Sequence, residues 1–151
     1  MLVYQEKEVV GHYSISTSGK GPGERMNSEK TPRGWHQIRA KIGKGQAANT
    51  VFIDRRPTGE VFTPEFRQTY PNRDWILTRI LWLSGLEVGK NRLGNVDTMR
   101  RFVYIHGSPD DVVMGQPGSR GCIRMRNNDI IELYDLVSSG DQVYIDAGNE
   151  E

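Results

Sequence analysis

Alternating hydrophobic and polar residues predict that most of the regular structure in this chain is β-strand. In such a pattern every second side chain lies on the same face, so that one face of a strand can be buried while the other meets water. The alternation is found in residues 9–16 and 35–42, and shorter segments of similar character are 2–4, 51–53 and 142–145. A charged turn at residues 5–8 would pair the first short segment with the strand after it, so we expect an N-terminal hairpin.

Residues 76–83 are apolar at almost every position and predict a central strand that is buried on both faces. Arg79 lies within this run, and a charged side chain is rarely buried without a partner. We expect its guanidinium to reach the sheet edge or to pair with a buried carboxylate. A further strand, residues 101–105, ends at His106 before a Gly-Ser-Pro-Asp turn, which places the His106 ring at a sheet edge.

One helix is predicted near the C-terminus, where Asn128 can cap a segment that ends at Gly140. Four apolar residues recur there at helical spacing: Ile130, Leu133, Tyr134 and Val137. Segments 64–75 and 85–97 lack a period and predict loops, the first with at most one helical turn, and residues 146–151 predict a frayed tail. The fold class is therefore mostly β, a sandwich or barrel with one main helix.

Length and composition favour a single domain over residues 1–151, large enough to bury a core without disulfides. The net charge of +1 gives no overall attraction to nucleic acid or to an anionic membrane. Arginines recur in residues 100–126, but no aromatic residues interleave with them, and nucleic acid is not an expected partner. The chain shows neither a membrane-spanning segment nor a signal peptide, which predicts a cytoplasmic location; a removed leader would place it in the periplasm or cell envelope.

Cofactor and metal sites are not expected. His12, His36, His106 and Cys122 show no ligand-pair spacing. The glycine-rich segment 18–24 lacks the Gly-Lys-Ser/Thr ending and the following helix of a phosphate-binding loop.

The single cysteine, Cys122, cannot form an internal disulfide, so its role is either packing or thiol chemistry. Packing is the commoner role of a lone cysteine, but its neighbours favour chemistry. Gly121 allows close approach to the amides of Arg120, Gly121 and Cys122, which could form an oxyanion hole. Arginines at 120, 124 and 126 are expected to lower the thiol pKa, and His106 is a candidate general base.

These residues also resemble a known catalytic signature. Two segments, Ile105-His106-Gly107-Ser108 and Ser119-Arg120-Gly121-Cys122-Ile123-Arg124-Met125, resemble the signature of the L,D-transpeptidase catalytic domain, also called the YkuD family. The resemblance extends over roughly Val9 to Ile145. Arg120 stands where many members have histidine. The family's base corresponds to His106, so we expect this difference to alter substrate preference rather than to abolish activity.

The resemblance implies roles for individual residues. Cys122 would be the nucleophile and His106 the base, oriented by the backbone carbonyl of Gly107 or Ser108. The acyl donor would be a peptidoglycan stem tetrapeptide or muropeptide, cut before its terminal D-alanine. Arg124 could bind the carboxylate at the cut end, or could serve only in a structural ion pair. Ser119 and Tyr104 are further substrate-binding candidates, with core packing as the alternative for Tyr104. Carbapenem-like β-lactams would acylate the thiol.

The acyl acceptor is the open question. The absence of an export signal favours transfer to water, as an L,D-carboxypeptidase that recycles peptidoglycan fragments. The alternative is an L,D-transpeptidase that transfers the acyl group to an amine and cross-links the wall. A more remote alternative is a peptidoglycan-binding module without activity.

Overall fold

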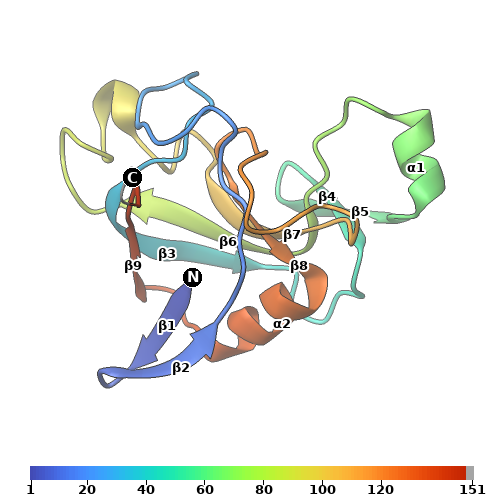
Figure 1. Cartoon of the computed structure of the whole chain (residues 1–151), viewed down its shortest axis with the longest axis horizontal. Coiled ribbons are helices and arrows are strands. Elements are labelled where there is room, and N and C mark those ends of the chain that lie inside the picture. Colours follow the sequence, from blue (N-terminus) through green and yellow to red (C-terminus); the bar gives the residue numbers. More distant parts are fainter. Residues whose placement is uncertain (149–151) are drawn as a thin grey trace.

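A computed structural model describes residues 1–148 and shows a mostly β fold with one main helix, as the sequence predicts. A two-stranded hairpin stands beside a seven-stranded sheet in which the strand order is β5-β4-β6-β3-β9 (Figure 1). Off this path, β7 pairs with β6, and β8 pairs with β7. The elements are β1 (Leu2–Gln5), β2 (Glu8–His12), β3 (Gly34–Ile42), β4 (Thr50–Ile53), β5 (Arg56–Val61), α1 (Pro64–Thr69), β6 (Leu77–Gly85), β7 (Tyr104–Ser108), β8 (Ile123–Arg126), α2 (Asn127–Leu136) and β9 (Gln142–Ile145), with a 3₁₀ turn at Gly94–Val96.

Strand β6 is the centre of the sheet, because it pairs antiparallel with β3, β4 and β7. The side chains of Leu77, Ile80 and Leu81 on this strand are completely buried. The prediction of a doubly buried central strand over residues 76–83 is thereby confirmed, since apolar residues at successive positions suit a strand covered on both faces.

The two faces of β7 and β8 have different tasks. Ile105 and Ile123 pack with Ile130 of α2 in the larger hydrophobic cluster, whereas Tyr104 belongs to a second cluster that Cys122 borders. Strand side chains alternate between faces. The face turned away from α2 therefore carries Tyr104 and His106 of β7. It also carries Arg124 of β8 and Cys122, the residue immediately before β8.

The expected placement of His106 at a sheet edge is wrong. The predicted strand 101–105 is in fact β7, which begins at Tyr104 and continues to Ser108, so His106 occupies its middle and is completely buried. The reason is β8, a short strand not predicted from the sequence. It pairs in parallel with β7 and holds Gly107 and Ser108 in the ladder, where a turn was expected.

Other boundaries also differ from the predictions. Helix α2 begins at Asn127 with Arg126 at the cap position and ends at Leu136, rather than running from Asn128 to Gly140. Strand β5, which the sequence analysis did not predict, follows a turn at residues 54–55, and α1 lies within the predicted loop 64–75. The predicted tail 146–151 lies partly outside the described residues, since these end at 148.

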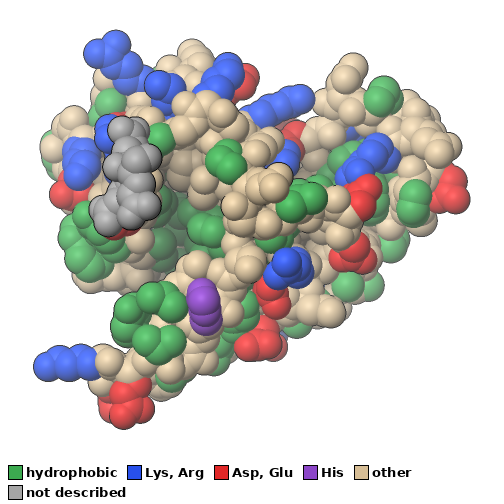
Figure 2. Space-filling model, in the orientation of Figure 1, with side chains coloured by type: hydrophobic (Ala, Val, Ile, Leu, Met, Phe, Trp, Pro, Cys, Tyr) green, Lys and Arg blue, Asp and Glu red, His purple; other side chains and the backbone are tan. Residues whose placement is uncertain are grey.

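The N-terminal hairpin of β1 and β2 is confirmed, although its second strand ends at His12 and does not continue to residue 16. Hydrophobic side chains gather on its surface at the lower left of Figure 2. The exposed ones are Leu2, Tyr4, Val9 and Val10. Within residues 1–148, every helix is too short or too polar to cross a membrane.

Removing one buried side chain from the centre of the sheet should measurably destabilise the fold. We expect Leu81→Ala to lower the free energy of unfolding by about 2–5 kcal/mol, because it leaves a cavity between β6 and α2. Val10→Ala on the exposed hairpin should cost less than about 0.5 kcal/mol and serves as the control. Urea denaturation followed by circular dichroism measures both, and equal losses would contradict this assignment of the core.

Candidate active site

The buried imidazole of His106 is held by the backbone carbonyl of the next residue. Nδ1 of His106 lies 2.6 Å from the Gly107 oxygen. A carbonyl oxygen can only accept a hydrogen bond, so Nδ1 carries the proton and Nε2 of the neutral ring keeps a free lone pair. Of the two carbonyls expected from the sequence, Gly107 therefore supplies this contact, while the Ser108 hydroxyl donates to the Met125 carbonyl at 2.9 Å.

The state of His106 suits a proton acceptor. Burial lowers its pKa below the ordinary value of 6.5, so the ring is neutral at neutral pH. Its Nε2 is buried and has no hydrogen-bond partner among the described residues. Unpartnered buried polar atoms are uncommon in folded proteins and often have a functional explanation. The unprotonated nitrogen of His106 is thus available for a proton from another group.

Cys122 lies beside Tyr104, immediately before β8, on the face of the sheet that also carries His106. Its sulfur accepts a hydrogen bond from the Tyr104 amide at 3.3 Å and lies 3.5 Å from the Phe102 carbonyl, to which the thiol can donate. The hydrogen bonds of the described residues include none between Cys122 and His106. In this conformation the thiol proton is directed to the backbone of residue 102 rather than to the imidazole.

The expected lowering of the thiol pKa by neighbouring arginines is wrong. Burial raises the pKa of Cys122 to about 12, and the opposing effects of the Tyr104 amide, Arg124 and Arg101 are smaller. Two of the three arginines named from the sequence have partners other than the thiol, although Arg120 borders the larger of the two cavities described below, as Cys122 does. Arg120 donates to the Asn72 carbonyl at 3.3 Å, and Arg126 lies 3.9 Å from a carboxylate oxygen of Asp129. The resting thiol is therefore protonated.

Ser119 organises the loop before the cysteine. Its hydroxyl donates to the Cys122 carbonyl at 2.5 Å and accepts the Gly121 amide at 3.2 Å. The Gly121 amide, one of three predicted oxyanion donors, is thus engaged within the loop, which leaves the amides of Arg120 and Cys122 as candidates. Ser119 is buried and lines neither cavity described below, so its hydrogen bonds support a structural role in the loop, and the substrate contact stays a prediction.

A cavity of about 440 Å³ opens in front of the thiol. Tyr104, for which the sequence left substrate binding and core packing open, lines it, and its hydroxyl accepts a hydrogen bond from Arg55 at 2.9 Å. The guanidinium of Arg55 also lies over the rings of Trp82 and Phe102, 4.9 and 4.8 Å from their centroids. The sequence analysis missed this contribution of the β4–β5 turn, although its run of charged residues before a proline and a glycine could have indicated a hairpin.

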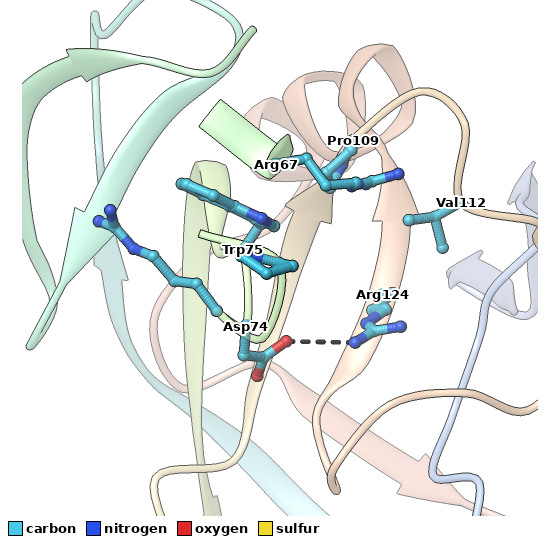
Figure 3. Close-up of a pocket in the computed structure, with 8 residues that line it drawn as sticks. Arg67, Asp74, Trp75, Pro109, Val112 and Arg124 are labelled. Carbon is cyan, nitrogen blue, oxygen red and sulfur yellow. Dashed lines mark hydrogen bonds and ion pairs between the residues drawn. The ribbon is translucent and has the colours of Figure 1, made fainter. Parts of the chain in front are cut away.

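A second, smaller cavity of about 200 Å³ adjoins the first, and the two share Arg73 and Asp74 in their walls. Arg124 lines the smaller cavity and forms an ion pair with Asp74 at 3.1 Å, drawn as a dashed line in Figure 3. Both expectations for Arg124 stay open, since it is ion-paired and also borders a cavity. The remaining lining residues are Arg67, Pro71, Trp75, Pro109 and Val112.

Within residues 1–148, histidine, cysteine and acidic side chains form no group of three or more that could hold an ion. His36 lies buried in β3, with its ring nitrogens 3.0 Å from the Gly34 carbonyl and 2.9 Å from the Thr98 hydroxyl.

Comparison with known proteins identifies the family. Residues 1–145 match the profile of the YkuD family, described as the L,D-transpeptidase catalytic domain, and the chain belongs to this family. A curated relative, "Putative L,D-transpeptidase YkuD" of Bacillus subtilis, is 46% identical over 41 residues, which are 27% of this chain and 25% of the relative.

Solved structures support the same fold. An L,D-transpeptidase of Xylanimonas cellulosilytica aligns with a TM-score of 0.52 at 16% identity and covers 95% of this chain and 53% of its own. A cysteine-to-serine mutant of the Enterococcus faecium L,D-transpeptidase has a TM-score of 0.54 at 16% identity, and the alignment covers 95% of this chain and 44% of the mutant chain. The "Ldtfm-avibactam carbamoyl enzyme" has a TM-score of 0.56 at 16% identity, and the alignment covers 98% of this chain and 45% of that enzyme's chain. This chain thus spans about half the length of these structures.

The raised pKa of Cys122 predicts a slow reaction with simple alkylating agents. At pH 8 a thiol with a pKa near 12 is about 10⁻⁴ thiolate, whereas an ordinary cysteine with a pKa of about 8.5 is roughly one quarter thiolate. We expect iodoacetamide to modify the folded protein at least about 10²-fold more slowly than the chain unfolded in guanidinium. Mass spectrometry of timed samples measures both rates, and similar rates would contradict a partly buried thiol with a raised pKa.

Proposed function

We propose that this protein is a cysteine acyltransferase that cuts the L,D-peptide bond before the terminal D-alanine of peptidoglycan stem tetrapeptides. The observation that carries the proposal is the arrangement of His106 and Cys122. A neutral imidazole with a free Nε2 lies on the same face of one strand pair as the only cysteine of the chain, which borders a cavity. Membership of the L,D-transpeptidase family supplies the substrate class.

The reaction begins with a proton transfer. The Cys122 side chain turns from the Phe102 carbonyl toward His106, and Nε2 takes the thiol proton as sulfur attacks the carbonyl carbon of the scissile bond. The amides of Arg120 and Cys122 are the candidates to stabilise the oxyanion. His106 then returns the proton to the leaving amine. The C–N bond breaks, a thioester to Cys122 remains, and D-alanine departs.

The cavity beside Arg124 is the best candidate for the leaving group. Free D-alanine and the end of the tetrapeptide both carry a carboxylate, and a guanidinium binds this group through paired hydrogen bonds. Arg73 also borders the cavity, with its guanidinium 4.5 Å from the centre of the Trp75 ring. Arg124 is only 18% exposed, so a carboxylate that reached it would be partly shielded from water.

The same cavity favours an amine as acyl acceptor. After D-alanine has left, a D-amino acid or a stem peptide that ends in one can place its carboxylate where the leaving group was. Transfer to this amine is the transpeptidase reaction. Transfer to water, the carboxypeptidase reaction favoured by the sequence analysis, then becomes the outcome when no amine is supplied. A binding module without activity would catalyse neither reaction.

Carbapenem-like β-lactams are proposed as inhibitors on the same grounds. Their strained amide is an electrophile that a thiol activated by His106 can open, which leaves an acyl group on Cys122. The carbamoyl enzyme formed with avibactam by the structural neighbour named above supports covalent modification of a protein with this fold.

Products from a purified substrate test the proposed reaction. We expect a disaccharide tetrapeptide to lose one alanine slowly in water and, with an added D-amino acid such as D-methionine, to give the exchanged tetrapeptide as the main product. Mass spectrometry identifies both. Cys122→Ala should give neither product, and activity retained in this variant would overturn the nucleophile assignment. Tripeptide formation that D-methionine leaves unchanged would instead establish a carboxypeptidase.

Replacing Arg124 should weaken acceptor use. We expect Arg124→Leu to raise the apparent KM for D-methionine in the exchange reaction by about 10-fold or more, because a charge-assisted bidentate contact is worth about 1.5–3 kcal/mol. Arg126→Leu is the matched control, since Arg126 is exposed and faces Asp129. Equal KM values for the two variants would assign Arg124 to the ion pair with Asp74 alone.

A further inference from the structure

Strand β6 is distorted where it faces the catalytic histidine. Its pairing with β7 skips two residues, Thr78 and Arg79, opposite the single peptide bond between His106 and Gly107. Thr78 has a φ of 76°, in the left-handed region that a β-branched residue rarely adopts. Bulges are over-represented beside active sites, and such a backbone persists only where the surrounding contacts enforce it.

The contacts that enforce this conformation reach Thr78 from both ends. The Arg79 guanidinium donates to the Thr78 carbonyl at 2.7 Å and to the Gln46 carbonyl at 2.7 Å. Backbone carbonyls are thus its partners, and the expected carboxylate or sheet edge is a wrong prediction. At the side chain, the Thr78 hydroxyl accepts a hydrogen bond from the backbone N–H of Asn49 at 3.0 Å. It donates one to the side-chain oxygen of Asn127 at 2.5 Å.

Asn127 has a defined orientation at the start of α2. Its amide nitrogen donates to the side-chain oxygens of Asn49 at 2.9 Å and Asp110 at 3.2 Å. Both donor contacts lie on the nitrogen side, so the amide oxygen is directed to the opposite side, where the Thr78 hydroxyl donates to it. The residue is almost completely buried and lines neither cavity.

The oxygen of Asn127 also packs against Gly107. A Cβ at position 107 would lie 2.6 Å from this oxygen, 2.6 Å from the Leu77 carbonyl oxygen and 3.0 Å from the Thr78 Cβ. Any side chain there would displace these groups, so the Gly107 peptide is enclosed on three sides. Its carbonyl is the one that accepts the His106 Nδ1 proton at 2.6 Å.

We propose that Thr78 and Asn127 are positioning residues for His106. Together they enclose the Gly107 peptide, and the fixed carbonyl keeps the proton on Nδ1 and the lone pair on Nε2. Neither residue contacts the reacting atoms, so their effect passes through Gly107. The importance of this for the rate rests on the proposed function, in which His106 is the base, whereas the effect on the histidine tautomer does not.

Thr78→Val tests the proposal, because valine keeps the β-branched shape and removes the hydroxyl. We expect kcat for alanine release from the tetrapeptide to fall by about 10- to 10²-fold, with KM nearly unchanged, as for a small displacement of a catalytic group. Thr78→Ser restores a hydroxyl and should return kcat to within about threefold of wild type. Long-range ¹H–¹⁵N NMR should show His106 as the Nδ1–H tautomer in the wild type and as a mixture in Thr78→Val.

Thr98→Val is the matched control. Thr98 is also completely buried, and its hydroxyl lies 2.9 Å from Nε2 of a different histidine, His36. The melting temperature of this variant should fall by about as much as that of Thr78→Val, while kcat and the His106 tautomer stay as in the wild type. A loss of kcat in Thr98→Val equal to that in Thr78→Val would reduce the effect to stability and overturn the proposal.

The two measurements separate this proposal from the proposed function. A wild-type protein that is inactive on the tetrapeptide would contradict the proposed function, and the NMR tautomer would still decide the positioning role. An unchanged Nδ1–H tautomer in folded Thr78→Val would overturn the positioning role whatever the activity. If Thr78→Val does not fold, Asn127→Ala removes the same hydrogen bond from its other end and carries the same expectations.

Discussion

The parallel pairing of β7 with β8 is the constraint on which the rest of the site depends. The register aligns His106 with Arg124 and places Cys122 beside Tyr104. Because strand side chains alternate, the same register turns Ile105 and the other apolar residues of both strands toward α2. A shift of the β7–β8 register by one residue would expose the apolar side chains of the core and, at the same time, remove His106 from the site. Core packing thus protects the catalytic geometry.

Burial then sets the charge state of the site. It lowers the pKa of His106 and raises that of Cys122, so both groups are neutral before substrate arrives. Many reactive cysteines are stabilised as thiolates by nearby positive charge. Here the charge of Arg124 is offset by Asp74, and the thiol remains protonated. A protonated thiol resists adventitious alkylation and oxidation, since the thiolate is the reactive form.

The sequence indicated the elements that local pattern determines. The N-terminal hairpin, the central strand and the helix follow from periodicity, and the match at Cys122 and His106 identified the family. The errors came from contacts between distant segments. Strand β8 is only four residues long and gave no periodic signal, so the burial of His106 and the raised thiol pKa were not foreseen. The contacts around Thr78 join residues from four separate segments, and no local sequence pattern predicts that these segments come together.

The ion pair between Asp74 and Arg124 has a consequence for how long a ligand stays in the smaller cavity. Asp74 already pairs with the Arg124 guanidinium, so an arriving carboxylate exchanges one anionic partner for another and gains less free energy than it would from an unpaired guanidinium. Under the proposed function, Arg124 orients the carboxylate of the leaving group or acceptor while it is bound, and Asp74 pairs with Arg124 again when it leaves. Rapid release suits a cavity that must be emptied and refilled in every catalytic cycle of the proposed reaction. A tightly bound product would block the next acceptor.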